Sequence, residues 1–475
     1  MLLETSAPSL TVLGVLYLAV EVVFCAVFFW IIVPLANRPA KNIEFRDYGR
    51  DRHLLVKRIL KRLQQQHKRK GTDTKHSSYG EHVRQFMKSW FVHNNNATSN
   101  DDHVLTKGDL DCFLAWAFFG KHLEDLESWE MKEFDIIHSV LPDNLCSEGP
   151  RTDGRHPMRL TLDGVGPSYR PAIIYGIFAL LYQTGSLALW MLGFRRYVID
   201  DSGLVYWHRP AGIVSMFKLF WDLSSYNTGN GVLPLLFFHG IAPGGLFFYI
   251  PMIISGLCSD GRPILLFENR PVSFSLCFRV HTEAETVAGV KEAVGRHLGT
   301  DAQLCVAGHS FGSCQLTWLL RDESLKQNIR QCVLMDPVSI LLSEPDVITN
   351  FLYSSGKHGA QNSMMDKIWI VAQELFIEYY LRRHFAWYNS ELWLEDVAPH
   401  THVVVCLALG DEIIDGHKVK RHVEQHIMEQ KVSTTWQVID WSDVSHGYCI
   451  PLPSAWEEIR LAMQGQEQSI RKQKM

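Results

Sequence analysis

Two long stretches of the chain are apolar and almost free of charge. Residues 12–33 carry one charged side chain, Glu21, and at about 1.5 Å per residue a helix of this length covers the roughly 30 Å core of a bilayer. The run is too long for a signal peptide and no Lys or Arg precedes it, so we expect an uncleaved transmembrane anchor within residues 1–37. Residues 171–194 are uncharged too, but polar residues interrupt their middle. They could span the membrane, lie in one leaflet or form a buried hairpin, and we expect a membrane-associated segment that does not span.

From residue 195 onward, short apolar runs alternate with amphipathic stretches. The expected strands are 198–207, which can form two strands, 233–238, 263–268, 304–307, 331–335, 402–409 and 436–441. The expected helices are 245–257, 283–298, 314–320 and 453–463. Strands that alternate with helices predict an α/β fold with a mostly parallel central sheet and helices on both faces. A long insertion of helical pattern, residues 337–400, interrupts this alternation.

The segment after the anchor is strongly basic. Residues 38–70 contain twelve Lys or Arg against three acids, and residues 1–11 contain no Lys or Arg. The positive-inside rule therefore places the C-terminal side of the anchor in the cytosol. Within this segment Leu54, Leu55, Ile59, Leu60 and Leu63 form an apolar stripe, so a helix here either lies on anionic lipid or packs its stripe on the body of the protein.

These patterns divide the chain into four parts. The anchor is followed by a basic and helical N-terminal region, residues 38–170, in which residues 72–103 are polar and expected to be a linker and residues 105–142 are expected to be helical. The apolar segment 171–194 comes next. Residues 195–475 form the α/β domain, which contains the insertion 337–400.

Composition excludes several classes of protein. The net charge of −5 over 475 residues argues against binding of nucleic acid. The ten cysteines match neither a zinc pattern nor a compact disulfide framework, which favours reduced thiols and a cytosolic catalytic domain. His422 and His426 lie one helical turn apart but lack the order and third ligand of a zinc site, so we expect neither a metal nor a cofactor.

Gly308-His309-Ser310-Phe311-Gly312 follows an apolar run and precedes a helical pattern. A strand that turns sharply into a helix with a serine between two glycines is typical of a nucleophile elbow, which exposes the serine hydroxyl in a cleft. Ser310 is therefore the candidate nucleophile.

An activated serine needs a base to take its proton and a carboxylate to orient that base. Asp411 follows the strand 402–409, and His446 follows the last strand, so we predict Asp411 as the acid and His446 as the base. Asp336, at the end of the strand after Ser310, is a rival acid.

An oxyanion needs two backbone N–H donors. The amide of Phe311, directly after the nucleophile, is one candidate. The second is expected in the loop that starts at His239-Gly240, which we treat as part of the binding site, with the amide of Ile241 as donor and that of Ala242 as the alternative.

In their order and spacing, HGIAPGG (239–245), GHSFGS (308–313), GDEIID (410–415) and SHG (445–447) resemble the α/β-hydrolase superfamily over residues 195–463. More narrowly, the chain is similar to membrane-anchored α/β-hydrolase proteins with a helical N-terminal region, through RLTLD (159–163), Arg170-Pro171, RHFAW (383–387) and Leu392-Trp393. The resemblance implies serine-hydrolase chemistry on acyl substrates, although the same fold also hosts acyl transfer and inactive members.

The insertion 337–400 lies where such proteins carry a lid, so we expect it to be one and call it the lid insertion. It is rich in large apolar side chains, which can line an acyl pocket or form a structural cap. They include Phe351, Leu352, Trp369, Phe376, Tyr379, Tyr380, Phe385, Trp387 and Trp393. Together with the anchor they predict a membrane-associated esterase or lipase, whose partners are membrane lipids and a lipophilic ester substrate. We expect a single-pass membrane protein, in a membrane such as that of the endoplasmic reticulum. The alternatives are an acyltransferase or thioesterase with the same three residues, and a catalytically silent membrane scaffold.

Overall fold

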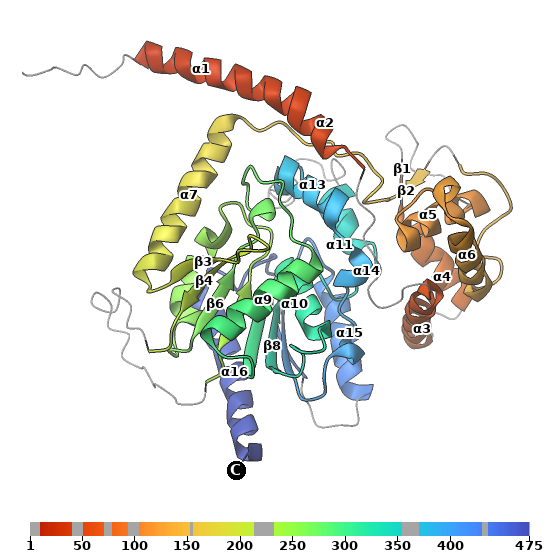
Figure 1. Cartoon of the computed structure of the whole chain (residues 1–475). Coiled ribbons are helices and arrows are strands. Elements are labelled where there is room, and N and C mark those ends of the chain that lie inside the picture. The colour runs from red at the N-terminus through yellow and green to blue at the C-terminus, as the bar shows by residue number, and fades with distance from the viewer. Residues whose placement is uncertain are drawn as a thin grey trace, which may run out of the picture.

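The computed structural model of the chain describes residues 10–39, 51–70, 78–93, 104–152, 155–212, 232–353, 370–429 and 436–474. A central sheet is covered by helices, a smaller helical region lies to one side of it, and two long apolar helices lie along another side (Figure 1). Trp369, expected in the lid, lies outside the described residues.

The sheet has eight strands in the described part of the chain. They are β3 Arg195–Val198, β4 Val205–Arg209, β5 Leu235–Phe238, β6 Ile264–Phe267, β7 Leu304–His309, β8 Ile329–Met335, β9 His402–Ala408 and β10 Trp436–Trp441. Their order across the sheet is β10-β9-β8-β7-β5-β6-β4-β3. β4 runs antiparallel to both of its neighbours, and the remaining pairs are parallel. The predicted mostly parallel sheet is confirmed.

Both faces of the central strands are apolar, because helices cover both. In β7, Leu304 and Val306 join the core on one face, which α9 Glu283–His297, α10 Gly312–Arg321 and α15 Gly416–Glu429 cover. Cys305 and Ala307 point to the opposite core, which α16 Pro453–Lys474 covers. This alternation is the period of two that a strand imposes on its side chains.

The expected helix 245–257 is broken into three short pieces. They are the 3₁₀-helix η4 Gly245–Tyr249, α8 Ile250–Met252 and the π-helical turn η5 Ile253–Leu257. Pro251 lies in the middle of the run and has no N–H to donate to a preceding turn, which explains why a continuous α-helix does not form.

The N-terminal region is a compact helical unit. Its elements are α3 Arg52–Lys70, α4 Tyr79–Lys88, β1 Phe91–His93, α5 Lys107–Phe119, η2 Leu123–Asp125, α6 Ser128–Val140 and β2 Arg155–Pro157, which pairs with β1. The expected linker is wrong for residues 79–93, because α4 is capped by Ser78 and buries Val83 and Met87.

The apolar stripe of α3 packs on the protein. Leu55, Ile59, Leu60 and Leu63 are buried, and Leu54 is half exposed. On the same helix the Arg62 guanidinium reaches Glu391 at 2.7 Å and Ser343 at 2.7 Å, both in the lid insertion. Of the two predicted roles for this helix, packing on the body is the one observed.

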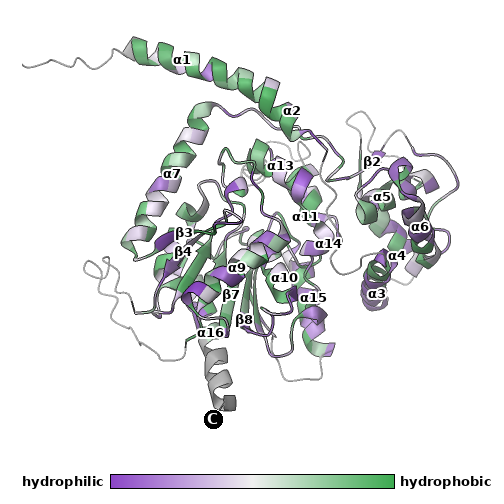
Figure 2. Ribbon diagram, in the orientation of Figure 1, coloured by the Kyte–Doolittle hydropathy of each residue, from purple (hydrophilic) through white to green (hydrophobic). Residues whose placement is uncertain are grey.

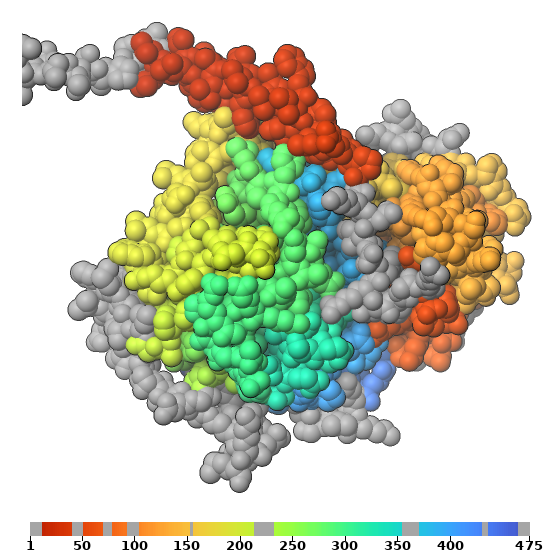
Figure 3. Space-filling model, viewed as in Figure 1, coloured from red at the N-terminus to blue at the C-terminus, as the bar shows by residue number. Residues whose placement is uncertain are grey.

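Two helices have the length and composition to cross a membrane. Residues 12–36 form one apolar helix made of α1 Leu10–Val27, the π-helical turn η1 Phe28–Ile32 and α2 Val33–Ala36, with a mean hydropathy of 2.6. The helix stands out from the body (Figure 3). The second is α7 Ala172–Met191, with a mean hydropathy of 1.6. The Glu21 carboxylate of α1 accepts hydrogen bonds from Tyr169 and from the Ala172 N–H at the start of α7, so the acid in the anchor has partners.

The lid insertion contains short helical elements beside the carboxyl ends of the strands. They are α11 Asp346–Ile348, η7 Thr349–Tyr353, α13 Leu375–His384, α14 Trp387–Ser390 and η8 Leu394–Asp396. A further short 3₁₀-helix, η6 Arg270–Val272, follows β6.

Candidate active site

Ser310 occupies a tight turn between β7 and α10. Its φ of +52° lies in the left-handed region, which costs free energy for any residue with a Cβ. A Cβ on Gly312 would lie 2.2 Å from the Phe238 carbonyl oxygen, and one on Gly308 would lie 2.8 Å from Leu316 Cδ1. The two glycines are therefore required for the packing of β7 and α10 around the serine.

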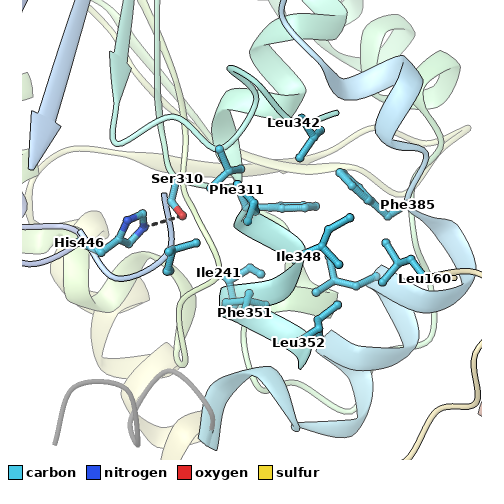
Figure 4. Close-up of a pocket in the computed structure, with 14 residues that line it drawn as sticks. Leu160, Ile241, Ser310, Phe311, Leu342, Ile348, Phe351, Leu352, Phe385 and His446 are labelled. Atoms are coloured by element: carbon cyan, nitrogen blue, oxygen red, sulfur yellow. Dashed lines mark hydrogen bonds between the residues drawn. The ribbon is translucent and has the colours of Figure 1, made fainter. Parts of the chain in front are cut away.

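The structure brings Ser310, His446 and Asp411 together from three separate loops. His446 Nε2 lies 2.8 Å from Ser310 Oγ, and His446 Nδ1 lies 2.5 Å from Asp411 Oδ2 (Figure 4 shows the first of these contacts). The other oxygen of Asp411 accepts the N–H groups of Ile413 and Ile414 at 2.7 and 3.0 Å, which fixes the carboxylate. A hydroxyl, an imidazole and a carboxylate in this order can activate the serine as a nucleophile.

Asp336 lies behind this row of residues and contacts the backbone. Its Oδ1 accepts the Ala408 N–H at 2.7 Å and its Oδ2 accepts the Gly447 N–H at 2.8 Å. Asp336, Asp411 and His446 form one cluster of metal-ligand type within the described residues, but these contacts already occupy the carboxylate oxygens of both acids. The cluster is a hydrogen-bonded network, and its geometry favours Asp411 over Asp336 as the partner of the imidazole.

Three carboxylates favour the charged form of His446. Burial opposes its protonation, but the charge and hydrogen bond of Asp411, with further contributions from Asp336 and Glu412, raise the pKa of His446 to about 9. Burial raises the pKa of Asp336. Glu412 also accepts the His446 N–H at 3.1 Å, so it holds the backbone of the histidine.

Two backbone N–H groups beside Ser310 are available to an incoming oxygen. In the described part of the chain, neither the Ile241 nor the Phe311 amide donates a hydrogen bond to another group. The Ala242 amide donates to the Val272 carbonyl at 3.0 Å, so the alternative donor is already used. Ile241 and Phe311 both line the cavity at Ser310. This arrangement suits an oxyanion.

The order of the strands decides the fold. The second strand in chain order, β4, is antiparallel, β6 lies between β4 and β5 in the sheet, and the fifth strand, β7, ends in the turn at Ser310. The chain has the α/β-hydrolase fold. Its Ser310, Asp411 and His446 follow β7, β9 and β10, the order in which this fold carries its catalytic residues.

Comparison with known proteins gives structural matches alone. No family model and no curated protein sequence matches the chain. A bacterial membrane phospholipase A described as a virulence factor aligns at 12% identity and a TM-score of 0.39, over 62% of this chain and 94% of that one. A Pyrobaculum calidifontis esterase aligns at 12% identity and a TM-score of 0.40, over 62% of this chain and 94% of that one. A Bacillus subtilis carboxylesterase aligns at 13% identity and a TM-score of 0.37, over 62% of this chain and 99% of that one.

The loop after β5 packs directly against the elbow of this hydrolase fold. A Cβ on Gly240 would lie 2.8 Å from Ser310 Cβ, so glycine is needed for the close approach. The Gly240 N–H donates to the Tyr249 hydroxyl at 2.9 Å, and the same hydroxyl is hydrogen-bonded to His309 Nδ1 at 2.8 Å. Tyr249 was not predicted from the sequence, and no local pattern identifies it, because its role depends on the fold bringing η4 to the elbow.

His239, predicted as part of the binding site, supports this loop and is not among the residues that line the cavity at Ser310. Its Nδ1 is hydrogen-bonded to the Gly240 carbonyl at 2.7 Å and its Nε2 accepts the Asn269 N–H at 3.0 Å. Burial lowers the pKa of His239 to about 4, so the ring is neutral. Ser313 was also missed: its hydroxyl donates to the Ser310 carbonyl at 2.6 Å and accepts the Ser339 N–H, which ties the elbow to the lid.

An apolar cavity of about 610 Å³, including its mouth, opens at Ser310 Oγ (Figure 4). Apart from Ser310 and His446 its walls are apolar. They comprise Leu160, Ile241, Phe311, Val338, Leu342, Val347, Ile348, Phe351, Leu352, Leu381, Phe385 and Ile413. Most of these come from the lid insertion, and Leu160 comes from the N-terminal region.

The lid aromatics divide between the two predicted roles. Phe351 and Phe385 line the cavity. Phe376 packs edge-on against Tyr175 of α7, and Trp387 packs against Phe118 of the N-terminal region. The insertion is therefore both a wall of the cavity and a structural connection to the rest of the chain.

Proposed function

We propose that the protein is a membrane-associated serine hydrolase that cleaves carboxylic esters of lipophilic acids through an acyl-enzyme. The observation that carries this proposal is the alignment of Ser310 Oγ, His446 and Asp411 at the mouth of an apolar cavity, beside two unused amides. The nucleophile, the base, the acid that orients the base and the donors to the oxyanion therefore each have a suitable group close to the cavity.

In the first half of the reaction Ser310 Oγ attacks the ester carbonyl carbon while His446 Nε2 takes the hydroxyl proton. The carbonyl oxygen becomes an oxyanion, which the Ile241 and Phe311 N–H groups stabilise. His446 then gives the proton to the alcohol oxygen as the C–O bond breaks, and the acyl group stays on Ser310. Asp411 holds the imidazole and stabilises its charged form.

In the second half a water attacks the acyl-enzyme with His446 as its base. The tetrahedral intermediate forms at the same amides, and its collapse releases the free acid and restores the Ser310 hydroxyl. A lipophilic acyl group is the best fit, because twelve of the fourteen residues around the cavity are apolar and would exclude water from a hydrocarbon chain.

The setting of the enzyme supports a lipid ester as the substrate. The apolar helix of residues 12–36 is long enough to anchor the chain in a bilayer, where such esters partition. The basic residues after it support a cytosolic catalytic domain, and a membrane such as the endoplasmic reticulum is our proposed location.

The test is labelling of the full chain in membranes with a fluorophosphonate, followed by mapping of the modified peptide. Wild type, Ser310→Ala and the matched variant Ser255→Ala, a partly buried serine of η5 outside the cavity lining, are compared. We expect labelling at Ser310 in wild type and in Ser255→Ala, and no labelling in Ser310→Ala. Absence of labelling in folded wild type would overturn the serine mechanism and favour the scaffold.

The substrate is then tested with acetyl, octanoyl and palmitoyl esters, with and without a competing alcohol. We expect faster hydrolysis of the longer acyl esters and release of free acid. Preference for acetyl esters would contradict the lipophilic acyl pocket, and formation of a new ester with the alcohol would identify an acyltransferase.

A further inference from the structure

One side of α7 is packed on the α/β-hydrolase domain along most of the helix. The Phe178 ring lies 4.7 Å from the Phe274 ring, centroid to centroid, and the Tyr182 hydroxyl donates to Glu268 at 2.8 Å. Nearer the end of α7, Gly185 lies so close to Phe247 of η4 that a Cβ would be 3.1 Å from Phe247 Cα. Leu189 is buried in the core that also holds β5 and β6. A helix attached to a soluble sheet at four successive turns cannot cross a bilayer unless the sheet crosses with it.

The opposite side of α7 is exposed and apolar. The exposed fractions of Ile173, Ile177, Leu180, Leu187 and Trp190 lie between 47% and 67%. Their spacing of four, three, seven and three residues places them on one helical face. Phe248 of η4, 47% exposed, extends this face beside the helix. We call Ile173, Ile177, Leu180, Leu187, Trp190 and Phe248 the outer face of α7, and Figure 2 shows the apolar character of the helix.

The polar residues of α7 are compatible with shallow contact with lipid. The Thr184 hydroxyl donates to the Leu180 carbonyl and the Ser186 hydroxyl to the Tyr182 carbonyl, both at 2.9 Å, so neither requires water. Gln183 is exposed near the middle of the helix, where a span would place it at the centre of the bilayer. Arg195 and Arg196, exposed directly after α7, are positioned for phosphate groups of lipids.

We propose that α7 lies in the plane of the membrane surface, with its outer face in the boundary between headgroups and acyl chains. The start of α7 contacts the apolar helix that we propose as the anchor, through the Glu21 carboxylate and the Ala172 N–H, so the two apolar helices are adjacent at this point. Consequently residues on either side of α7 lie on one side of the membrane. This inference does not depend on the chemistry of Ser310.

The position has a consequence for the proposed catalysis. η4, which α7 contacts at Gly185, follows the oxyanion loop and carries Tyr249, whose hydroxyl accepts the Gly240 N–H. The helix in contact with lipid thus holds the segment that positions the Ile241 amide.

Topology is tested first, with the full chain in sealed vesicles and a membrane-impermeant maleimide. Asp125→Cys lies before α7 and Asp201→Cys lies after it, both at exposed positions, and wild type gives the background of native cysteines. We expect both variants to be labelled from the same side, without opening the vesicles. Labelling from opposite sides would overturn the proposal and make α7 a membrane span.

Contact with lipid is tested with a fluorescent label on Leu180→Cys, in vesicles of phosphatidylcholine and phosphatidylserine that carry a spin-labelled lipid. Glu292→Cys, exposed on α9, is the matched control. We expect spin-labelled lipid to quench the label at position 180 several-fold more than the label at 292. Equal quenching, with position 180 open to iodide, would overturn the proposal. Disulfide cross-linking between two copies through position 180 would instead assign the outer face to self-association.

Discussion

The N–H of Gly447, the residue after His446, donates a 2.8 Å hydrogen bond to Asp336 Oδ2. The other Asp336 oxygen accepts the Ala408 N–H at the end of β9. The carboxylate therefore joins the histidine loop to the strand that leads to Asp411. Asp336 is a positioning residue for the proposed base, placed beside the acid that contacts it.

Asp336→Asn should weaken this connection without removing the proposed catalytic row. An amide has one acceptor oxygen, so one of the two buried N–H groups loses its partner, at a cost of about 1–3 kcal/mol in the free energy of unfolding. Loss of the negative charge should also lower the pKa of His446, because Asp336 helps to raise it. Denaturant unfolding and the pH profile of hydrolysis measure the two effects.

For comparison, Asp411→Asn should cost about 10⁴-fold in kcat, as the equivalent change does in serine proteases. An equally large loss in Asp336→Asn would identify Asp336 as the catalytic acid.

The rate of hydrolysis should rise with pH. His446 acts as a base when neutral, and its pKa is raised to about 9, so kcat/KM should fall progressively as the pH drops below this value. The free energy of unfolding changes with pH in the opposite direction. The raised pKa of His446 stabilises the fold below a pH of about 6.5, and this stabilisation is lost as the pH rises through about 9. Glu412→Gln should move the rising limb of the pH profile to lower pH. A profile that is flat between pH 6 and 9 would contradict this assignment of the base.

Gly185→Val should reduce activity from a distance. A side chain here meets the Phe247 backbone, displaces η4 and disturbs the loop that presents the Ile241 amide. We expect kcat to fall by up to about 10²-fold, the lower end of the cost of losing an oxyanion donor. Gly176→Val is the matched control, because a Cβ at this position of the same helix has no atom within 4 Å. Equal activity of the two variants would show that α7 does not position the loop.

Arg62→Met should destabilise the whole protein. The Arg62 side chain is 5% exposed and lies between the buried acids Glu391, at 2.7 Å, and Glu344, at 3.9 Å. Removing the guanidinium leaves the buried Glu391 carboxylate without its cation, while Glu344 keeps its pair with Lys418. Loss of one partner of a buried pair costs about 3–5 kcal/mol. Arg69→Met is the control on the same helix, because its pair with Glu429 is about half exposed and should contribute less than about 1 kcal/mol. Thermal unfolding of both variants measures the difference.

The residues nearest the proposed chemistry could be predicted because local patterns specify them. A glycine-flanked serine between a strand and a helix has few other uses, and Asp411 and His446 follow apolar strands at the edge where parallel strands end. The sheet was predictable for the same reason. A strand that is buried on both faces has a continuous apolar run, such as residues 304–307. The alternation of such runs with helical patterns then indicates a parallel sheet.

The supporting contacts could not be predicted, because they join segments that are remote in sequence. Nothing around Leu160 indicates that it reaches a cavity formed by residues 338–413. The stripe of α3 fits lipid and protein equally well until its partners are known, since both environments are apolar. The His239-Gly240 pair predicts the loop but not the direction of the His239 ring, which contacts the backbone of its own loop.

Arg62 and Glu391 are 329 residues apart in the chain. At the usual rate of synthesis of about 5–20 residues per second, α3 leaves the ribosome roughly 16 to 66 seconds before its acidic partner exists. During this interval α4 and α6, which contact α3, are already made, but Arg62 still lacks its buried acid. Anionic lipid headgroups can hold the basic side chains of α3 transiently, a short distance along the chain from the proposed anchor. These side chains can thus have two anionic partners in succession, lipid while the chain is being made and the acids of the lid afterwards.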